Sequence, residues 1–285
     1  MTLPAVGGTK SAPHGAPPMK TQVNGIALAY SDQGTGLPLV FLHAFPLNRR
    51  MWTAQEEGLS SRFRVITIDL RGHGESDAPL WHYTLDQAAE DVRALLDQLS
   101  IQQAVLIGLS MGGYILFAFY RKYAARVKGL VLADTKAQAD SVEGKQARFQ
   151  LAQISYLNGS SAIADVMIPR LLSPGTISTR PEIVEQVRTM IEGNQTSGIV
   201  GDLMAMAERP DSLPTLTQIT CPTQIIVGEL DAMTPLSDAR TMADTIPGAR
   251  LAVIPGAAHL ANLEQPELFT RIVRSFASDL AEKRN

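Results

Sequence analysis

The segment that most constrains the fold of this chain is residues 108–112, Gly-Leu-Ser-Met-Gly, which joins a strand-like apolar run directly to a helix-like one. A strand that passes at once into a helix needs a very sharp turn, which holds its middle residue in a strained, usually left-handed conformation. Gly108 and Gly112 are the small neighbours that such a turn requires. The pattern therefore predicts that Ser110 projects from the end of a sheet, with the Met111 N–H aimed at the same point.

An acidic residue and a histidine follow Ser110, each just after a short apolar run typical of a strand. Asp231 follows the run at residues 223–228, and His259 follows the run at residues 250–255. Because open α/β sheets gather their ligand sites at the carboxyl ends of the strands, we expect the three side chains to meet there. A serine hydroxyl is a poor nucleophile near neutral pH, so it needs a histidine to take its proton and a carboxylate to fix the imidazole tautomer. The order serine, acid, histidine thus predicts a catalytic triad.

Four separate matches give the chain a resemblance to the α/β-hydrolase fold family. They are Phe-Leu-His-Ala-Phe-Pro at residues 41–46, Asp-Leu-Arg-Gly-His-Gly-Glu-Ser at residues 69–76, the turn around Ser110, and the pair Asp231 and His259. The resemblance runs roughly from Val23 to the C-terminus. It is closest to small serine esterases and lactonases of the 3-oxoadipate enol-lactonase-like or non-haem perhydrolase-like type. Ala44 and Ala258 stand where the family usually has glycine.

The resemblance also implies roles for residues outside the triad. The N–H groups of Phe45 and Met111 form an oxyanion hole that holds the negative charge of a tetrahedral intermediate, and their side chains line the pocket. His43 has a structural, hydrogen-bonding role. Asp134, which ends the strand after the serine's helix, is the alternative acid. Asp231 is preferred because most members of the family keep the acid after the following strand.

Strand-like and helix-like runs alternate along the chain, which predicts an α/β fold with a mostly parallel central sheet and helices on both faces. About ninety residues separate the strands that end near Asp134 and begin near Thr223, whereas a crossover needs about a dozen. We expect residues 20–134 and 216–285 to form the hydrolase core and residues 135–215 an inserted helical lid. The four methionines of this insertion suit an adaptable acyl pocket, although packing within the lid is the expected role of any single one of them. The overlong connection and its apolar helical segments predict that the lid admits small, mainly apolar acyl groups. Residues 1–19, rich in Pro, Gly, Ala and Ser, are expected to form a flexible extension.

The composition excludes several classes of function. The net charge is −3 and the pI is near 6.0, with no block of like charges that could bind nucleic acid or an anionic membrane. No apolar run approaches the roughly 20 residues needed to cross a bilayer, and residues 1–19 lack the apolar region of a secretory signal. The single cysteine, Cys221, cannot form an intrachain disulfide. No metal-ligand spacing occurs, and Gly72 and Gly74 do not extend to a dinucleotide motif. We expect a cytoplasmic protein without metal or cofactor, whose partner is a small molecule and whose oligomeric state is open.

Together these features predict a serine hydrolase that cleaves carboxylic esters or lactones of small to medium size through an acyl-enzyme intermediate. Three alternatives remain open at this stage. The chain could be a perhydrolase, in which peroxide replaces water, or a C–C bond hydrolase of the same fold. It could also be a signal-binding protein that keeps the triad but turns over slowly.

Overall fold

The computed structural model describes residues 18–80 and 82–282. An eight-stranded sheet runs through these residues in the order β1-β2-β4-β3-β5-β6-β7-β8. The strands are β1 (Met19–Val23), β2 (Ile26–Gln33), β3 (Pro38–Leu42), β4 (Arg64–Ile68), β5 (Ala104–Leu109), β6 (Val127–Ala133), β7 (Thr223–Gly228) and β8 (Arg250–Ile254). Pairing is antiparallel between β1 and β2 and between β2 and β4, and parallel from β4 to β8. The predicted fold class, an α/β hydrolase fold with a mostly parallel sheet, is confirmed.

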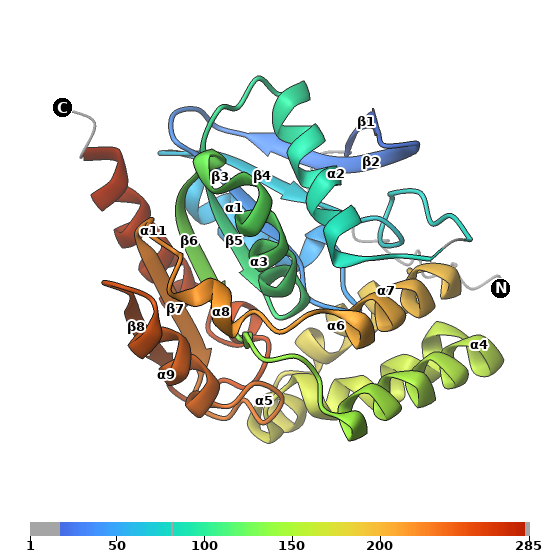
Figure 1. The fold of residues 1–285 in the computed structure, drawn as a ribbon. Coiled ribbons are helices and arrows are strands. Elements are labelled where there is room, and N and C mark those ends of the chain that lie inside the picture. Colours follow the sequence, from blue (N-terminus) through green and yellow to red (C-terminus); the bar gives the residue numbers. More distant parts are fainter. Residues whose placement is uncertain (1–17, 81, 283–285) are drawn as a thin grey trace, which may run out of the picture.

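Helices cover both faces of this sheet (Figure 1). α1 and α11 pack together on one face, and α2 and α3 pack together on the other. The central strands β5 and β7 are buried along their whole length, as expected of parallel strands covered on both sides. The helices of the core are α1 (Thr53–Leu59), α2 (Leu85–Gln98), α3 (Met111–Tyr123), α8 (Leu213–Leu216), α9 (Leu236–Thr245), α10 (Ala261–Glu264) and α11 (Pro266–Glu282).

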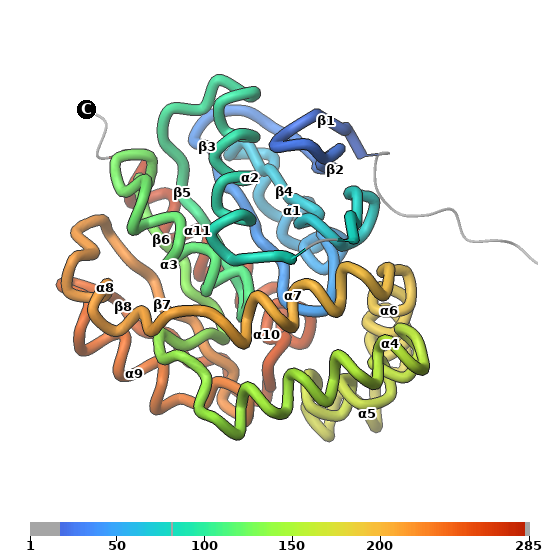
Figure 2. The backbone as a smooth tube through the Cα atoms, turned by 45° about the vertical axis from the view of Figure 1, so that its right-hand side comes forward, coloured from blue at the N-terminus to red at the C-terminus, as the bar shows by residue number. Residues whose placement is uncertain are grey.

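Four further helices lie between β6 and β7, where the sequence predicts the insertion. They are α4 (Val142–Leu171), α5 (Pro174–Thr179), α6 (Pro181–Glu192) and α7 (Thr196–Glu208). α7 and α6 pack along α4, and Figure 2 shows the group at one end of the sheet. α4 is two straight segments joined at Gly159, whose φ of 79° and ψ of −176° are not helical. This conformation is open to glycine and strained for other residues.

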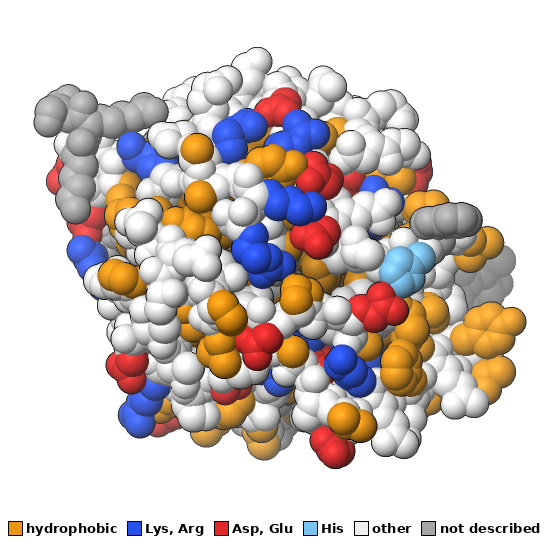
Figure 3. Space-filling model, in the orientation of Figure 1, with side chains coloured by type: hydrophobic (Ala, Val, Ile, Leu, Met, Phe, Trp, Pro, Cys, Tyr) orange, Lys and Arg blue, Asp and Glu red, His pale blue; other side chains and the backbone are white. Residues whose placement is uncertain are grey.

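The two ends of the chain are described only in part. Residues 1–17 of the expected N-terminal extension lie outside the described residues, and Met19 is the first residue of β1. Across residues 18–80 and 82–282, no helix has the length and apolar character needed to span a bilayer. On the face shown in Figure 3, basic and acidic side chains lie next to one another rather than in separate stripes.

Candidate active site

Ser110 occupies the sharp turn between β5 and α3. Its φ of 54° and ψ of −110° are the strained left-handed backbone that the sequence predicts for this position. A Cβ added to Gly108 would lie 2.5 Å from the carbonyl carbon of Gly112, and one added to Gly112 would lie 2.4 Å from the Leu42 carbonyl oxygen. Only glycine therefore fits at either position. The turn places Ser110 at the carboxyl end of β5, where its side chain borders a cavity.

Asp231 and His259 form a buried pair at the ends of β7 and β8. His259 Nδ1 lies 2.8 Å from Asp231 Oδ2, and both side chains are almost fully buried. Asp231 also accepts hydrogen bonds from the N–H groups of Met233 and Thr234 and from the Thr234 hydroxyl. Burial by itself would raise the pKa of Asp231, but the His259 charge and these hydrogen bonds outweigh it and lower the pKa. Asp231 is thus held as a carboxylate against the imidazole.

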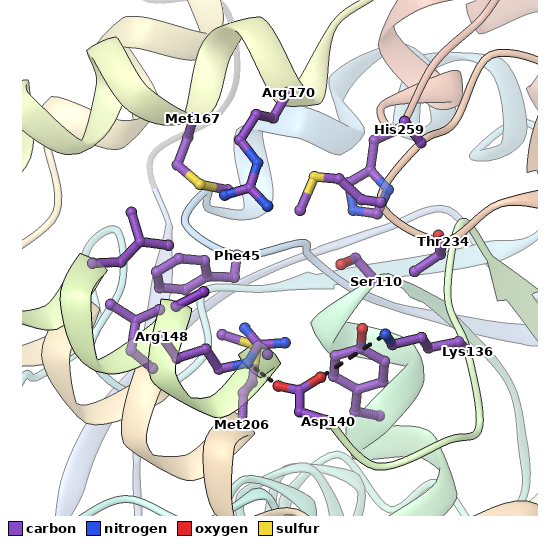
Figure 4. A pocket seen from close by; sticks show the side chains of 17 residues that line it. Phe45, Ser110, Lys136, Asp140, Arg148, Met167, Arg170, Met206, Thr234 and His259 are labelled. Carbon is purple, nitrogen blue, oxygen red and sulfur yellow. Dashed lines mark hydrogen bonds and ion pairs between the residues drawn. The ribbon is translucent and has the colours of Figure 1, made fainter. Parts of the chain in front are cut away.

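The other ring nitrogen of His259 is available for chemistry. His259 Nε2 is buried and has no hydrogen-bond partner among the described residues. Ser110, His259 and Phe45 all line one cavity of about 210 Å³ (Figure 4). The structure therefore brings together the predicted serine and histidine at one cavity, with the predicted acid behind the histidine.

Asp134, the alternative acid, has a different environment. Its backbone is strained, with φ at 40°, and its Oδ1 accepts the Gly228 N–H at 2.7 Å. Burial, followed by the nearby charge of Asp231, raises the pKa of Asp134 well above its usual value. The carboxylate that His259 Nδ1 contacts is that of Asp231. Asp134 is instead a buried group whose hydrogen bond with the Gly228 N–H joins the ends of β6 and β7.

The loop after β3 forms a tight turn over the cavity. The Ala44 carbonyl accepts the Leu47 N–H at 2.8 Å and lies 2.9 Å from His43 Nδ1. His43 Nε2 accepts the Leu70 N–H, so the proton of the neutral ring is on Nδ1. Burial, with a smaller contribution from His73, lowers the pKa of His43 well below its ordinary value. His43 therefore has the structural role that the resemblance implies.

These contacts also orient the Phe45 N–H. In a trans peptide the N–H points opposite to the C=O, so holding the Ala44 carbonyl fixes the direction of the Phe45 N–H. Neither the Phe45 N–H nor the Met111 N–H donates a hydrogen bond to another of the described residues. The Phe45 side chain lines the cavity as predicted. That of Met111 is fully buried and does not line it, which corrects the prediction; the first turn of α3 carries it into the core.

Alanine is tolerated at the two positions where the family usually has glycine. Neither Ala44 nor Ala258 has a positive φ, so neither backbone conformation requires glycine.

The cavity wall is more polar than the methionine-rich insertion predicts. Met167 and Met206 line it, whereas the two other methionines of the insertion, Met190 and Met204, do not. Its charged residues are Lys136, Asp140, Arg148 and Arg170. Met167 and Arg170 reach the cavity from the end of α4 and Met206 from the end of α7, whereas Arg148 lies inside the first segment of α4.

The single carboxylate of this wall is already paired. Asp140 contacts Arg148 and lies 2.8 Å from Arg209. Burial by itself would raise the pKa of Asp140, but its hydrogen bonds with the two arginines lower it far below its usual range. Arg170 takes part in no hydrogen bond or ion pair among the described residues, and Figure 4 shows its guanidinium pointing into the cavity from α4. The wall thus has an excess of positive charge.

Three residues that support the site were not found from the sequence. The Thr234 hydroxyl donates to Asp231 Oδ2 at 2.6 Å, and Glu264 Oε1 accepts the Ala258 N–H at 2.7 Å, beside His259. Asn194 hydrogen-bonds the loop that contains Phe45. The only sequence signal for Thr234 is its position three residues after the acid, and Asn194 lies in a segment that reads merely as a helix end. Within the described residues, no group of three or more His, Cys, Asp or Glu side chains could hold a metal ion.

Comparisons with known proteins agree with this geometry. The profile of a family described as "alpha/beta hydrolase fold" matches residues 38–266. Among curated proteins, 3-oxoadipate enol-lactonase 2 of Acinetobacter baylyi is 33% identical over 252 residues, which cover 88% of this chain and 92% of that protein. Among solved structures, a thermophilic esterase from Thermogutta terrifontis with malate bound is 43% identical, with a TM-score of 0.89 over 93% of this chain and 100% of that one. The enol-lactonase from Burkholderia xenovorans is 30% identical, with a TM-score of 0.86 over 91% and 100%.

Proposed function

The chain belongs to the alpha/beta hydrolase fold family, and we propose that it is a serine hydrolase that cleaves carboxylic esters or lactones. One observation carries the proposal. The Asp231–His259 pair stands behind a cavity that Ser110 and His259 both line, with the free Nε2 of His259 buried beside it. The esterase and enol-lactonase relatives support the same chemistry.

We propose the following sequence of steps. His259 Nε2 takes the proton of Ser110 while the hydroxyl oxygen attacks the substrate carbonyl. Asp231 holds the imidazole with its proton on Nδ1 and stabilises the imidazolium that forms. The Phe45 and Met111 N–H groups donate to the tetrahedral oxyanion. His259 then protonates the leaving alcohol, and water repeats the cycle on the acyl-enzyme to release the acid.

The inserted helices α4 to α7 act in this proposal as a lid on the core. They supply Arg148, Met167 and Arg170 to the cavity opposite Ser110. By enclosing the cavity they exclude water and position the acyl group, which supports the transition state. We accordingly place the substrate specificity in residues 135–215 and the reaction in the core.

The charge of the cavity supports a substrate that carries a carboxylate. Arg170 is unpaired, and Lys136 is 3.9 Å from a carboxylate already held by two arginines. The name of one relative refers to 3-oxoadipate, and the structure of another contains malate, which are both dicarboxylic acids. A cavity of about 210 Å³ suits a short acyl chain with a charged end. We therefore propose small anionic esters or lactones rather than purely apolar ones.

Labelling and turnover test the reaction. A fluorophosphonate should modify Ser110 in the wild type and leave Ser110→Ala unmodified, and this variant should lose roughly a millionfold in kcat on p-nitrophenyl acetate. The wild type should turn over repeatedly, on the order of once per second or faster. Label on another residue of an active sample would refute the nucleophile. One product equivalent followed by almost no turnover would favour a signal-binding protein.

A matched pair of esters tests the substrate class. Mono-p-nitrophenyl glutarate and p-nitrophenyl pentanoate have the same chain length, and differ by a terminal carboxylate or methyl group. Arg170 is solvent-exposed, and an exposed ion pair contributes about 0.2–1 kcal/mol, so kcat/KM should favour the glutarate by up to roughly fivefold. Arg170→Gln should remove most of this preference and change the rate on pentanoate less than about twofold. A wild-type preference for pentanoate would contradict the anionic substrate.

A further inference from the structure

Asn194 connects the inserted helices to the loop that contains Phe45. It lies in the turn between α6 and α7, and its side chain is buried. Asn194 Nδ2 donates to the Pro46 carbonyl at 2.6 Å and to the Leu47 carbonyl at 3.3 Å. Its Oδ1 accepts the Gly74 N–H at 2.7 Å. One uncharged side chain thus joins the loop after β3 to the turn after β4.

The two bonds that Asn194 donates reach Pro46 and Leu47, which follow Phe45 in the turn that orients its N–H. The part of the turn before Phe45 is held by His43, which contacts the Ala44 carbonyl and accepts the Leu70 N–H. The Leu47 N–H closes the turn by donating to the Ala44 carbonyl, so the position of Leu47 sets the direction of that carbonyl. Asn194 holds the peptide that contains this N–H, through the Pro46 carbonyl, and the following peptide, through the Leu47 carbonyl. If they move, the Ala44 carbonyl and the Phe45 N–H on the same peptide plane move with them.

The helix that follows Asn194 is fixed to the core by other contacts. A Cβ added to Gly198 would lie 1.8 Å from the Gly72 carbonyl oxygen, so the two backbones are in direct contact. The Ser197 hydroxyl donates to the Ala78 carbonyl at 3.1 Å, and Asp202 lies 3.3 Å from His73. Loss of the Asn194 side chain should therefore leave α7 in place. The hydrogen bonds of Asn194 act on the loop, rather than serving as the main attachment of the helix.

We infer that Asn194 is a positioning residue for the oxyanion hole, through which the inserted helices set the direction of the Phe45 N–H. The inference rests on the proposed hydrolysis, because the Phe45 N–H is an oxyanion donor only if that reaction takes place. It gives the insertion a part in transition-state stabilisation beyond lining and covering the cavity. An oxyanion donor contributes about 10²–10³ in kcat, and a displacement of about 1 Å can cost a hundredfold.

Substitutions at Asn194 and at its neighbour Ser197 test the inference. Asn194→Ala removes all three hydrogen bonds. Asn194→Asp has the same shape and still accepts the Gly74 N–H, but its carboxylate cannot donate to Pro46 or Leu47. Ser197→Ala is the matched control, because it removes a bond between the same helices and the core away from the turn. We expect kcat on p-nitrophenyl acetate to fall about 10- to 100-fold in both Asn194 variants, with KM within about threefold. Ser197→Ala should stay within about twofold of wild type.

An inhibitor provides the readout that a purely structural role would not change. An aryl trifluoromethyl ketone adds to the serine and places an oxyanion in the hole, so its affinity should fall by the same factor as kcat/KM. The affinity of the matching p-nitrophenyl ether, which has no carbonyl and cannot place an oxyanion in the hole, should change less than about threefold. Unchanged kcat and inhibitor affinity in folded Asn194→Ala, or in folded Asn194→Asp if the alanine variant is unstable, would overturn the inference. A wild type that neither hydrolyses the ester nor labels at Ser110 would instead refute the proposed function.

Discussion

Replacement of Asp231 by asparagine should inactivate the protein through the hydrogen bonds around this residue. Asp231 Oδ1 accepts the N–H groups of Met233 and Thr234, at 2.8 and 3.1 Å, and Oδ2 faces His259 Nδ1 and the Thr234 hydroxyl. In Asp231→Asn the two backbone donors hold the amide oxygen on their side. The amide NH₂ then faces His259 and forces the ring proton from Nδ1 to Nε2. A protonated Nε2 cannot accept the proton of Ser110.

The size of the loss follows from the cost of turning the amide round. The productive orientation leaves two buried N–H groups facing a donor, at about 1–3 kcal/mol each. A total of about 4 kcal/mol, at 1.36 kcal/mol per factor of ten, leaves roughly one molecule in a thousand competent. The range of about 2–6 kcal/mol corresponds to a loss between about 30-fold and 26,000-fold. We therefore expect kcat/KM of Asp231→Asn to fall about a thousandfold.

The assay compares this variant with Asp134→Asn. Asp134 is not the carboxylate that contacts His259, and an asparagine there still accepts the Gly228 N–H, so kcat/KM should stay within about threefold of wild type. Both variants are measured on p-nitrophenyl acetate, and far-UV circular dichroism and Tm confirm that they are folded. If Asp231→Asn keeps more than a tenth of the activity, or if Asp134→Asn loses more than Asp231→Asn, the assignment of the acid is wrong.

Two further predictions concern the backbone turn and the cysteine. Gly112→Ala should abolish activity and lower the Tm by at least about 4 °C, since the new Cβ would lie 2.4 Å from the Leu42 carbonyl oxygen. Gly175→Ala, whose Cβ would meet nothing closer than 3.9 Å, is its control and should leave both unchanged. Burial raises the pKa of Cys221 to about 11, so little of it is thiolate at pH 8. Its reaction with a disulfide reagent should be at least about tenfold slower in the native protein than in urea, and equal rates would show that the thiol is accessible.

The parts of the molecule that the sequence predicts are those encoded locally or by chain order. The turn at Ser110 could be predicted because a sharp turn from strand to helix needs small residues at both ends, although the atom that crowds Gly112 is the Leu42 carbonyl oxygen of the neighbouring strand. Asp231 could be preferred to Asp134 from the order of the strands, and the structure then gives it the imidazole contact. Asn194 could not be identified, because its role depends on contacts with Pro46 and Leu47, about 150 residues away in the chain.

The polarity of the cavity could not be predicted from the sequence, for a related reason. Apolar periodicity indicates which face of a helix packs against the core, but it says little about the side chains near the helix ends. Arg148 and Arg170 reach the cavity from separate segments of α4, and only the packing of that helix against α6 and α7 brings them to one wall. The methionines predicted an apolar pocket because their neighbours in space were unknown.

The break in α4 at Gly159 divides this part of the cavity wall between two helical segments. Arg148 belongs to the segment before the glycine, and Met167 and Arg170 belong to the segment after it. A Cβ at position 159 would have no atom within 4 Å, so the join itself is unpacked, and the angle between the segments is set by the backbone at this residue and by their packing on α6 and α7. Under the proposed function, a change of this angle would alter the distance from Ser110 to Arg170, and with it the length of acyl chain that fits, without altering a residue that touches Ser110 or His259. Under the proposed function, the residues that select the length of the substrate are therefore separate from those that carry out the reaction.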